Sequence, residues 1–531
     1  MHHITKLLPA LLMSGLSVTV AATPPMLKPL PQSGFNAITL FTVGESIGDY
    51  RPPGVLDGTA AYPGEDGSLR IIINHELAPV AGYPYQLAND TTLTGSRISY
   101  MDLDTAAKTI TAAGPAFDTV IDRNGTTVKD AQQISELLVE DNRGLNALCS
   151  AQGYLAGEFG FVDDLFFTHE EVSAREDHPH GGSVWVLDVN ARTLQAAPEL
   201  GRGAWENSAA VATPDMNEPD GHVAILLGDD IEFGDAPLYL WIGRKQPGGN
   251  LLERNGLSNG RLFAWVPDNG AETPADWRGT GNKLAGRFVP LAARNEKRRG
   301  QPGYDPAGYL DDLTLRKRTR ELGAFRFSRP EDLHTDPANQ QRVAFASTGQ
   351  GDVFPDDDWG ALYIIDMDFR LDDQKKLAAD ATLTIIYDGD DEDKGDFGIR
   401  NPDNLVWAGD GFVYVQEDKA SKLNEFGGKS GMEASVWRID PDEPDNYERI
   451  AMIDRSVIQP PNAEDLNPDK LGRWESSGIL DVTDYFPNAP GRVFIATVQA
   501  HSLRGGDIGG REDLVQGGQL LLLEEKLLPA K

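Results

Sequence analysis

The sequence contains a single cysteine, Cys149, among its 531 residues. An internal disulfide and a zinc site built from several cysteines are therefore excluded. Basic residues are also scarce, because 48 Lys and Arg stand against 82 Asp and Glu and give a formal net charge of −34. A chain this acidic repels phosphate backbones and anionic lipid, so we expect no binding to nucleic acid or to membrane surfaces. Hard cations that prefer oxygen ligands suit such a chain better.

Long apolar runs are missing as well. The run at residues 7–20 follows Lys6, is interrupted by Pro9 and Gly15, and is too short to span a bilayer. It ends at Ala21 and Ala22, the small-residue pattern at which a secretory signal peptide is cleaved; a disordered or buried N-terminus is the alternative. No Arg-Arg pair precedes it, which favours a general secretory (Sec-type) signal over a twin-arginine one. We expect a signal peptide at 1–22, no membrane span, and a periplasmic or secreted mature protein.

Glycine and proline, by contrast, are abundant, with 56 and 34 residues, and they favour many short strands and turns over long helices. A short apolar strand that stops abruptly in acidic or polar residues occurs six times, at 71–76, 165–171, 222–230, 343–349, 412–418 and 493–501. A polar phrase precedes each copy, at 53–57, 146–149, 205–207, 329–332, 402–404 and 475–478. Further apolar strands follow five of the copies, at 182–188, 238–242, 362–366, 435–439 and 518–523.

Six units of this kind predict an all-β fold, a six-bladed β-propeller with long loop inserts. One blade cannot bury both of its faces alone, whereas six blades in a ring can, and the ring leaves only short, protected edges. Two β-sandwich domains are the alternative, but sandwiches do not predict polar phrases at equivalent places in six units. We expect one propeller domain over residues 23–531, with an insert at about 268–325.

Two segments interrupt the repeat. Residues 278–320 carry 11 Lys and Arg against 4 acids. A solvated surface excursion is the favoured interpretation, and a lid that draws anions toward the propeller mouth is the other one. Residues 388–396 contain six acids but lack the ligand spacing of an EF-hand loop, so we expect a solvated turn there.

Acidic residues recur at the ends of the predicted strands, and in a propeller these ends meet near the central channel. The acids brought together in this way are Glu76, Glu170, Glu171, Glu206, Asp229, Asp230, Glu331, Asp403, Glu417 and Glu475. Carboxylates that lie so close cannot all stay ionised unless cations hold them together, and calcium suits an oxygen-rich set. A wet tunnel lined by acids, without metal, is the alternative.

Cys149 lies in one of the polar phrases, so its sulfur is expected to face the same channel. A thiolate is a soft ligand and selects iron, copper or zinc over calcium. A lone buried cysteine that acts only as a small apolar residue is the alternative.

At these residues the chain resembles the PhoX-type alkaline phosphatases, a family of secreted six-bladed propellers. The matching segments, in chain order, are 74–76, 148–150, 169–171, 202–207, 228–230, 329–332, 403–405 and 475–479. The resemblance implies a phosphomonoesterase with a mixed iron and calcium cluster in the channel, acting on small phosphorylated metabolites. The twin-arginine signal common in that family is absent here. We expect a monomer.

The resemblance also implies roles for individual residues. It makes Cys149 an iron ligand and places Glu76, Glu171, Glu206, Glu331 and Glu475 in the metal shell. The convergence of strand ends adds Glu170, Asp229, Asp230 and Asp403 to the candidate ligands. Arg329 is expected to grip the substrate phosphate, since a guanidinium matches phosphate oxygens, with Glu331 as its catalytic neighbour and Asn207 and Asn404 as further substrate contacts.

Two other classes of function stay open. A calcium-dependent propeller hydrolase could act on lactones or phosphotriesters, but such an enzyme would need neither Cys149 nor Arg329. A non-catalytic scaffold could use calcium only to tie its blades together.

Overall fold

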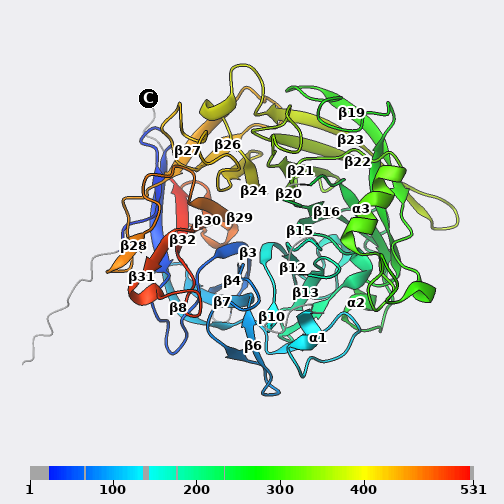
Figure 1. Ribbon diagram of the computed structural model, residues 1–531, viewed down its shortest axis with the longest axis horizontal. Coiled ribbons are helices and arrows are strands. Elements are labelled where there is room, and N and C mark those ends of the chain that lie inside the picture. Colours follow the sequence, from blue (N-terminus) through cyan, green and yellow to red (C-terminus); the bar gives the residue numbers. More distant parts are fainter. Residues whose placement is uncertain (1–22, 65–66, 136–142, 175–177, 233, 527–531) are drawn as a thin grey trace, which may run out of the picture.

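The computed structural model describes residues 23–64, 67–135, 143–174, 178–232 and 234–526. The predicted signal peptide, residues 1–22, lies outside the described residues. Within these ranges the chain is mostly strand, and the strands form six blades around a central axis (Figure 1). The prediction of an all-β, six-bladed propeller is therefore confirmed.

The first three blades follow one another along the chain. Blade 1 consists of β3 (Leu56–Pro63), β4 (Leu69–His75), β7 (Arg97–Asp104) and β8 (Thr109–Pro115). Blade 2 consists of β11 (Leu148–Tyr154), β12 (Leu165–Glu170), β13 (Val184–Asp188), β14 (Thr193–Ala196) and the added β9 (Thr119–Ile121). Blade 3 consists of β15 (Trp205–Val211), β16 (His222–Asp229), β17 (Tyr239–Arg244) and β18 (Gly260–Pro267).

The other three blades complete the circle. Blade 4 consists of β20 (Pro330–Thr335), β21 (Arg342–Ser347), β22 (Ala361–Leu371) and β23 (Leu377–Asp388). Blade 5 consists of β24 (Pro402–Trp407), β25 (Val413–Glu417), β26 (Ser435–Ile439), β27 (Tyr447–Ile453) and the added β1 (Leu27–Pro29). Blade 6 consists of β29 (Glu475–Asp481), β30 (Val493–Ala500), β32 (Gly517–Glu525) and β2 (Phe35–Thr42).

The ring is closed in two ways. Around the axis, each inner strand contacts the inner strands of both neighbouring blades, in the order β3, β11, β15, β20, β24, β29 and back to β3 (Figure 1). At the rim, β2 from the N-terminal part pairs antiparallel with β32 from the C-terminal part, from Phe35 opposite Glu525 to Thr42 opposite Gln519. Blade 6 therefore contains strands from both the N-terminal and the C-terminal parts of the chain, and their pairing closes the ring.

The core consists of apolar layers between neighbouring blades. In β4, Ile71 and Ile73 belong to an apolar cluster that also contains residues of blades 5 and 6, whereas Ile72 belongs to one that contains residues of blade 2. Successive side chains of a strand point to opposite faces, so a strand buried on both faces must be apolar at every position. This is why the repeated strands read as continuous apolar runs.

The predicted insert at 268–325 joins two blades at their outer edges. Its strand β19 (Lys283–Pro290) pairs with β18 of blade 3 and with β23 of blade 4, which merges both blades into one nine-stranded sheet. Many of its basic side chains pair with acids, among them Arg278 with Asp356 and Arg294 with Glu199. This local neutralisation favours a surface excursion over an open anion-attracting lid.

Short helices and small sheets occupy the loops. The α-helices are α1 (Gln132–Ser135), α2 (Leu251–Arg254) and α3 (Asp312–Glu321). The 3-10 helices are η2 (Glu158–Gly160), η3 (Pro198–Leu200), η4 (Glu296–Arg298), η5 (Gly395–Phe397), η6 (Thr483–Tyr485) and η7 (Gly506–Ile508). The small sheets contain β5 (Tyr85–Gln86), β6 (Thr92–Gly95), β10 (Gly144–Leu145), β28 (Ala463–Asp465) and β31 (Leu503–Gly505). In the part of the chain that the structure describes, every helix is too short or too polar to cross a membrane.

Candidate metal centre

The inner strands of five blades carry the same irregularity at their first residues. In each, the pairing with the second strand skips two residues of the inner strand, between Leu56 and Thr59, Leu148 and Ala151, Trp205 and Ser208, Pro330 and Leu333, and Pro402 and Leu405. Such bulges re-aim a side chain and are common beside functional sites. The first skipped residues are Asp57, Cys149, Glu206, Glu331 and Asp403. Since the inner strands surround the axis, these five side chains meet there.

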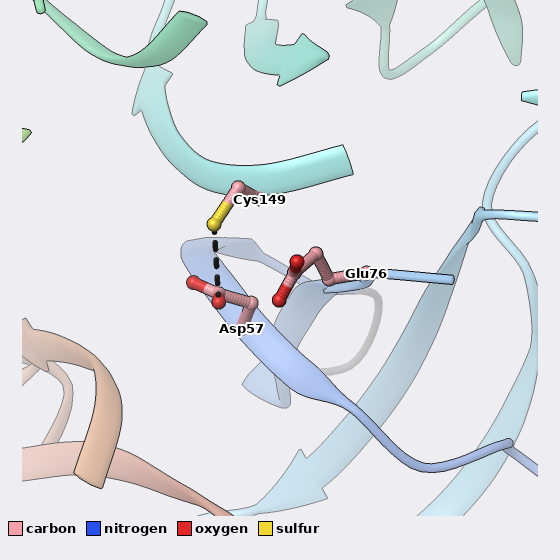
Figure 2. Close-up of side chains that lie close together, drawn as sticks. All are labelled: Asp57, Glu76 and Cys149. Atoms are coloured by element: carbon pink, nitrogen blue, oxygen red, sulfur yellow. Dashed lines mark hydrogen bonds between the residues drawn. The ribbon is translucent and has the colours of Figure 1, made fainter. Parts of the chain in front are cut away.

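Their ligand atoms, with four more acids, form a chain of overlapping groups. Within each group the atoms lie within 4.8 Å of one another, and the groups are Asp57, Glu76 and Cys149; Cys149, Glu171 and Glu206; Glu206, Glu331 and Asp403; and Asp403, Asp418 and Glu475. Figure 2 shows the first group, in which the three side chains point toward one another and Cys149 Sγ lies 3.5 Å from Asp57 Oδ2. Shared members link all four groups into one centre.

The second strand of several blades ends in two consecutive polar residues that take different directions. In blade 2, Glu170 pairs with the buried Arg123, whereas Glu171 joins Cys149 in the centre. Blade 5 repeats this pattern, where Glu417 Oε2 lies 2.7 Å from Arg400 Nη2 while Asp418 joins the centre. The alternation follows from the period of two in an extended chain.

The structure thus separates the predicted ligands into two sets. Seven of them come together, namely Glu76, Cys149, Glu171, Glu206, Glu331, Asp403 and Glu475. Three lie in ion pairs instead, namely Glu170 with Arg123, Asp229 with Arg316, and Asp230 with Arg329.

Sequence reasoning missed two members of the centre, Asp57 and Asp418. Asp57 ends the polar phrase 53–57 at the place that Cys149 takes in blade 2, and Asp418 follows Glu417 as Glu171 follows Glu170. Aligning the six units residue by residue would have found both.

The electrostatics of the centre call for positive charge. Burial raises the pKa of Asp57 to about 8, with further contributions from Glu76 and Glu475. Burial also raises the pKa of Glu76 to about 7, and it raises the pKa of the Cys149 thiol, to which Asp57 contributes next. Glu206 and Asp403 follow the same rule, since burial and then Glu331 raise the pKa of each carboxyl well above its usual range. Anions packed this densely need cations among them.

Unpaired oxygen atoms support the same conclusion. Among the described residues of the centre, three buried carboxylate oxygens have neither a hydrogen-bond nor an ion-pair partner, namely Asp57 Oδ1, Glu206 Oε1 and Asp403 Oδ1. A buried polar atom without a partner costs free energy, so native proteins provide one. Eight carboxylates with one thiol also match a mixed set of hard and soft cations. The residues present therefore fit a multi-metal centre.

Positive side chains lie at the Glu475 end of the centre. His501 Nε2 is 2.8 Å from Glu475 Oε2, and Lys419 Nζ is 3.9 Å from carboxylate oxygens of both Asp418 and Glu475. Burial alone would raise the pKa of Glu475, but His501 and Lys419 outweigh it and lower the pKa below its usual range. The Lys419 side chain is 49% exposed, which leaves its charge accessible to a ligand.

Arg329 is held in a fixed orientation beside the centre. Its Nε and Nη2 donate to Asp230 at 2.9 and 2.7 Å, while Nη1 lies 3.0 Å from Asp418 and Nη2 lies 3.1 Å from Glu331. Asp230 therefore orients the guanidinium, and the edge with both terminal nitrogens faces two acids of the centre. Its backbone φ of 58° is left-handed, which is uncommon for a residue other than glycine.

The two asparagines predicted as substrate contacts differ in their free bonding capacity. Asn404 Oδ1 accepts from Ser477 and from the backbone of Gly478, and its Nδ2 donates to Ser150. Asn207 is also buried, but its Nδ2 has no hydrogen-bond partner. Asn207 is thus the one of the two with a spare donor.

Replacing Arg316 by methionine is expected to lower the free energy of unfolding by about 3–5 kcal/mol, because two buried carboxylates would lose their cation. Arg316 on α3 pairs with Asp229 and Asp312, and all three side chains are at most 2% exposed. Urea denaturation measures the change. Arg318→Met on the same helix is the control, since its partner Glu321 is exposed and its loss should change little. Equal effects of both variants would contradict a stabilising buried pair.

Comparisons with known proteins agree with this arrangement. A family model described as alkaline phosphatase PhoX matches residues 146–437. Among solved structures, PhoX of Pseudomonas fluorescens in complex with vanadate, a transition state analogue, has a TM-score of 0.61 at 15% identity, covering 95% of this chain and 97% of its own. A GH43 β-1,3-galactosidase reaches a TM-score of only 0.33, at 10% identity over 76% of this chain and 92% of its own. A search of curated proteins gives no match. The matched residues include Cys149, Glu171, Glu206, Glu331, Asp403 and Asp418 of the centre.

Proposed function

The chain belongs to the alkaline phosphatase PhoX family, and we propose that it hydrolyses phosphoric monoesters at the centre on the propeller axis. As a member of that family it is a metal-dependent phosphoric monoester hydrolase, and its substrates are phosphate esters. One observation supports the assignment of this activity to the channel: carboxylates and one thiol from all six blades come together there, in a chain that matches the family.

The metals are proposed to be calcium and iron. Asp57, Glu76 and Cys149, with Glu171 and Glu206, would hold the ion that prefers a sulfur ligand, for which iron is the candidate. The carboxylate-only groups, Glu206, Glu331 and Asp403 and then Asp403, Asp418 and Glu475, would hold calcium. When bound, such cations neutralise the charge that develops on the phosphoryl oxygens.

The substrate phosphate is proposed to contact Arg329 through the guanidinium edge that faces Glu331 and Asp418. Glu331 is a candidate metal ligand that also lies 3.1 Å from Nη2 of Arg329, which is why we assign Glu331 and Arg329 to the catalytic site. The spare amide donor of Asn207 and the exposed Lys419 can each add a contact to a phosphate oxygen. Asn404 shapes the wall of the site through its bonds to Ser477 and Ser150.

Cys149→Ser is expected to lose iron while calcium largely stays, since serine keeps the size but offers a hard, protonated oxygen in place of a thiolate. Elemental analysis of the purified variant measures both metals. Ser150→Ala is the matched control in the adjacent position of the same bulge. A Cys149→Ser protein with full iron and full turnover would mean that Cys149 is only a core residue.

The assay that tests the function uses three substrates side by side. Purified protein should hydrolyse an aryl phosphomonoester, and a chelator should stop the reaction. The corresponding phosphotriester and a lactone distinguish the alternative propeller hydrolase. Turnover of the triester or lactone without the monoester would overturn the proposal, and no turnover of any of them in the metal-loaded protein would favour a calcium-bound scaffold.

We also propose that residues 1–22 direct export through the general secretory route, so that the mature enzyme is periplasmic or secreted and acts as a monomer on small phosphorylated metabolites. N-terminal sequencing of the exported protein tests the cleavage after Ala22. Size-exclusion chromatography with light scattering tests the oligomeric state.

A further inference from the structure

Both charged segments that interrupt the repeat are packed against the protein. In the acidic segment 388–396, Asp388 and Asp396 are only 6% and 4% exposed, so the expectation of a solvated turn is wrong for these two residues. In the basic segment 278–320, Arg316 is 2% exposed and lies on α3, beside the end of β16 (Figure 1). An arginine this deeply buried does not attract anions from solvent, and its charge serves a contact inside the protein.

Two consecutive acids at the end of β16 are each held by one arginine. Arg316 binds Asp229 with two nitrogens, since Nε donates to Oδ2 at 2.8 Å and Nη2 donates to Oδ1. Arg329 binds Asp230 in the same way, with Nε 2.9 Å from Oδ1 and Nη2 2.7 Å from Oδ2. The arginine of the insert and the arginine assigned to the substrate phosphate therefore share one short stretch of chain as their anchor.

This stretch is held tightly enough to pass a displacement from Asp229 to Asp230. Both residues are at most 2% exposed. Asp229 Oδ1 accepts from the backbone N–H of Ala204 at 2.9 Å, and its backbone oxygen accepts from Ile231 at 3.0 Å. Ala204 in turn forms a β-bridge with Glu171, a candidate metal ligand. Packed interiors leave little room for independent movement, so a shift of the Asp229 carboxylate moves its neighbours.

A second contact of Arg316 reaches the loop that starts at Glu171. Its Nη1 donates to Asp312 Oδ2 at 2.7 Å, and the same oxygen accepts from the backbone of Ala174 at 3.1 Å. All three guanidinium nitrogens of Arg316 are therefore bonded to Asp229 or Asp312 inside the protein. Arg316 thus connects this loop with the turn at the end of β16.

We propose that Arg316 is a positioning residue for phosphate binding, which acts through the acids at the end of β16 to hold the guanidinium of Arg329 toward the centre. The inference rests on the proposed function, because Arg316 acts through the arginine assigned to the substrate phosphate. A misplaced guanidinium binds phosphate less tightly and lowers the rate, since its nitrogens must meet the phosphoryl oxygens within hydrogen-bond distance. The insert thus contributes to the site by orienting an arginine that lies outside it.

A double-mutant cycle on the metal-loaded protein tests this role, with Arg316→Lys, Arg329→Lys and the double variant beside the wild type. Lysine keeps the charge at position 316 but cannot bind the oxygens of Asp229 and Asp312 together as the planar fork does. Arg316→Lys alone is expected to lower kcat/KM for an aryl phosphate about tenfold. In the Arg329→Lys background it should lower kcat/KM no further, because the group that it orients is already lost. Its cost in the free energy of unfolding, measured in urea, should appear in both backgrounds.

Binding of inorganic phosphate gives a readout that does not depend on turnover. Equilibrium dialysis of the metal-loaded protein should show about tenfold weaker binding for Arg316→Lys, again only in the background that retains Arg329. Arg320→Met is the matched control, because Arg320 lies on the same helix and pairs with Asp235, shortly beyond Asp230, but its side chain is 42% exposed. It should keep the wild-type kcat/KM and phosphate affinity.

Three results would overturn the positioning role: unchanged kcat/KM and phosphate affinity in Arg316→Lys, equal losses from this change in both backgrounds, or the same loss in Arg320→Met. Equal losses in both backgrounds would mean that Arg316 supports the fold without acting through Arg329. If the wild type hydrolyses no phosphomonoester, the proposed function fails and the phosphate-binding cycle alone decides the positioning role; a wild type that binds no phosphate would overturn both. Asp229→Asn replaces Arg316→Lys in the cycle if that variant does not fold, since an amide offers the fork one acceptor oxygen instead of two.

Discussion

Exhaustive chelation is expected to abolish hydrolysis of an aryl phosphate and to lower the temperature of thermal unfolding at the same time. Both effects have one cause, because the acids that would bind the metals also form the inner wall of all six blades. Without cations, Asp57, Glu206 and Asp403 keep buried oxygens with no partner and face further carboxylates. An ion present at 1,000 times its Kd stabilises the native state by about 4 kcal/mol, and several ions add to this.

Differential scanning calorimetry and a phosphatase assay on the same samples measure the two effects. Metal content must be determined in each sample, so that incomplete removal is recognised. Restoring calcium and iron should recover activity and the unfolding temperature together. A protein that is free of metal yet unfolds at the same temperature and keeps its activity would contradict a structural and catalytic metal centre.

The fold could be predicted because the repeat records it directly. The six apolar copies at 71–76, 165–171, 222–230, 343–349, 412–418 and 493–501 coincide with β4, β12, β16, β21, β25 and β30, the second strand of every blade. A strand buried on both faces leaves an unbroken apolar run, which stands out in a polar sequence. Strands with one partly exposed face, such as β2 and β8, carry no such signal, so ring closure through β2 was not predictable.

The site was predictable to the level of the strand end but not to the level of the single residue. Residues at the end of a strand alternate in direction, so Glu170 and Glu171 enter the same list from sequence although only Glu171 faces the axis. The partner that neutralises Glu170 is Arg123, which is remote in sequence and carries no signal that names its acid. Such pairing depends on the tertiary structure alone.

The position of a residue within the bulge separates the candidate metal ligands from their structural neighbours. In each bulge two residues of the inner strand oppose one residue of the second strand. The first residues of these pairs are Asp57, Cys149, Glu206, Glu331 and Asp403, whereas the second residues include Asn207, Asp332 and Asn404. Asp332 illustrates the difference, because its oxygens accept backbone N–H groups of Leu333 and Leu405 and so join neighbouring strands. One step along the bulge separates a candidate ligand from a structural acid.

Arg329→Lys is expected to lower kcat/KM by about 10²–10³, which corresponds to roughly 2–4 kcal/mol of transition-state binding. The guanidinium uses one edge to bond Asp230 and turns both terminal nitrogens to the acids of the centre, so it can be oriented and bind phosphate at once. A lysine ammonium keeps the charge but is a point donor and cannot do both. Its contact with the phosphate should therefore weaken most as charge develops on the phosphoryl oxygens.

Three comparisons separate this role from a structural one. Metal content should be unchanged, because Arg329 is not among the candidate ligands, and the backbone strain at φ 58° is the same for lysine as for arginine. Arg326→Lys is the matched control, since Arg326 precedes the same strand and pairs with Asp235 and Glu272 away from the centre. It should keep wild-type kcat/KM. The opposite result would be a lower unfolding temperature for Arg329→Lys with kcat/KM at the level of Arg326→Lys. In that case the guanidinium serves only to neutralise Asp230, Glu331 and Asp418. Another cation must then hold the phosphate, and Lys419, which lies beside Asp418, is the candidate.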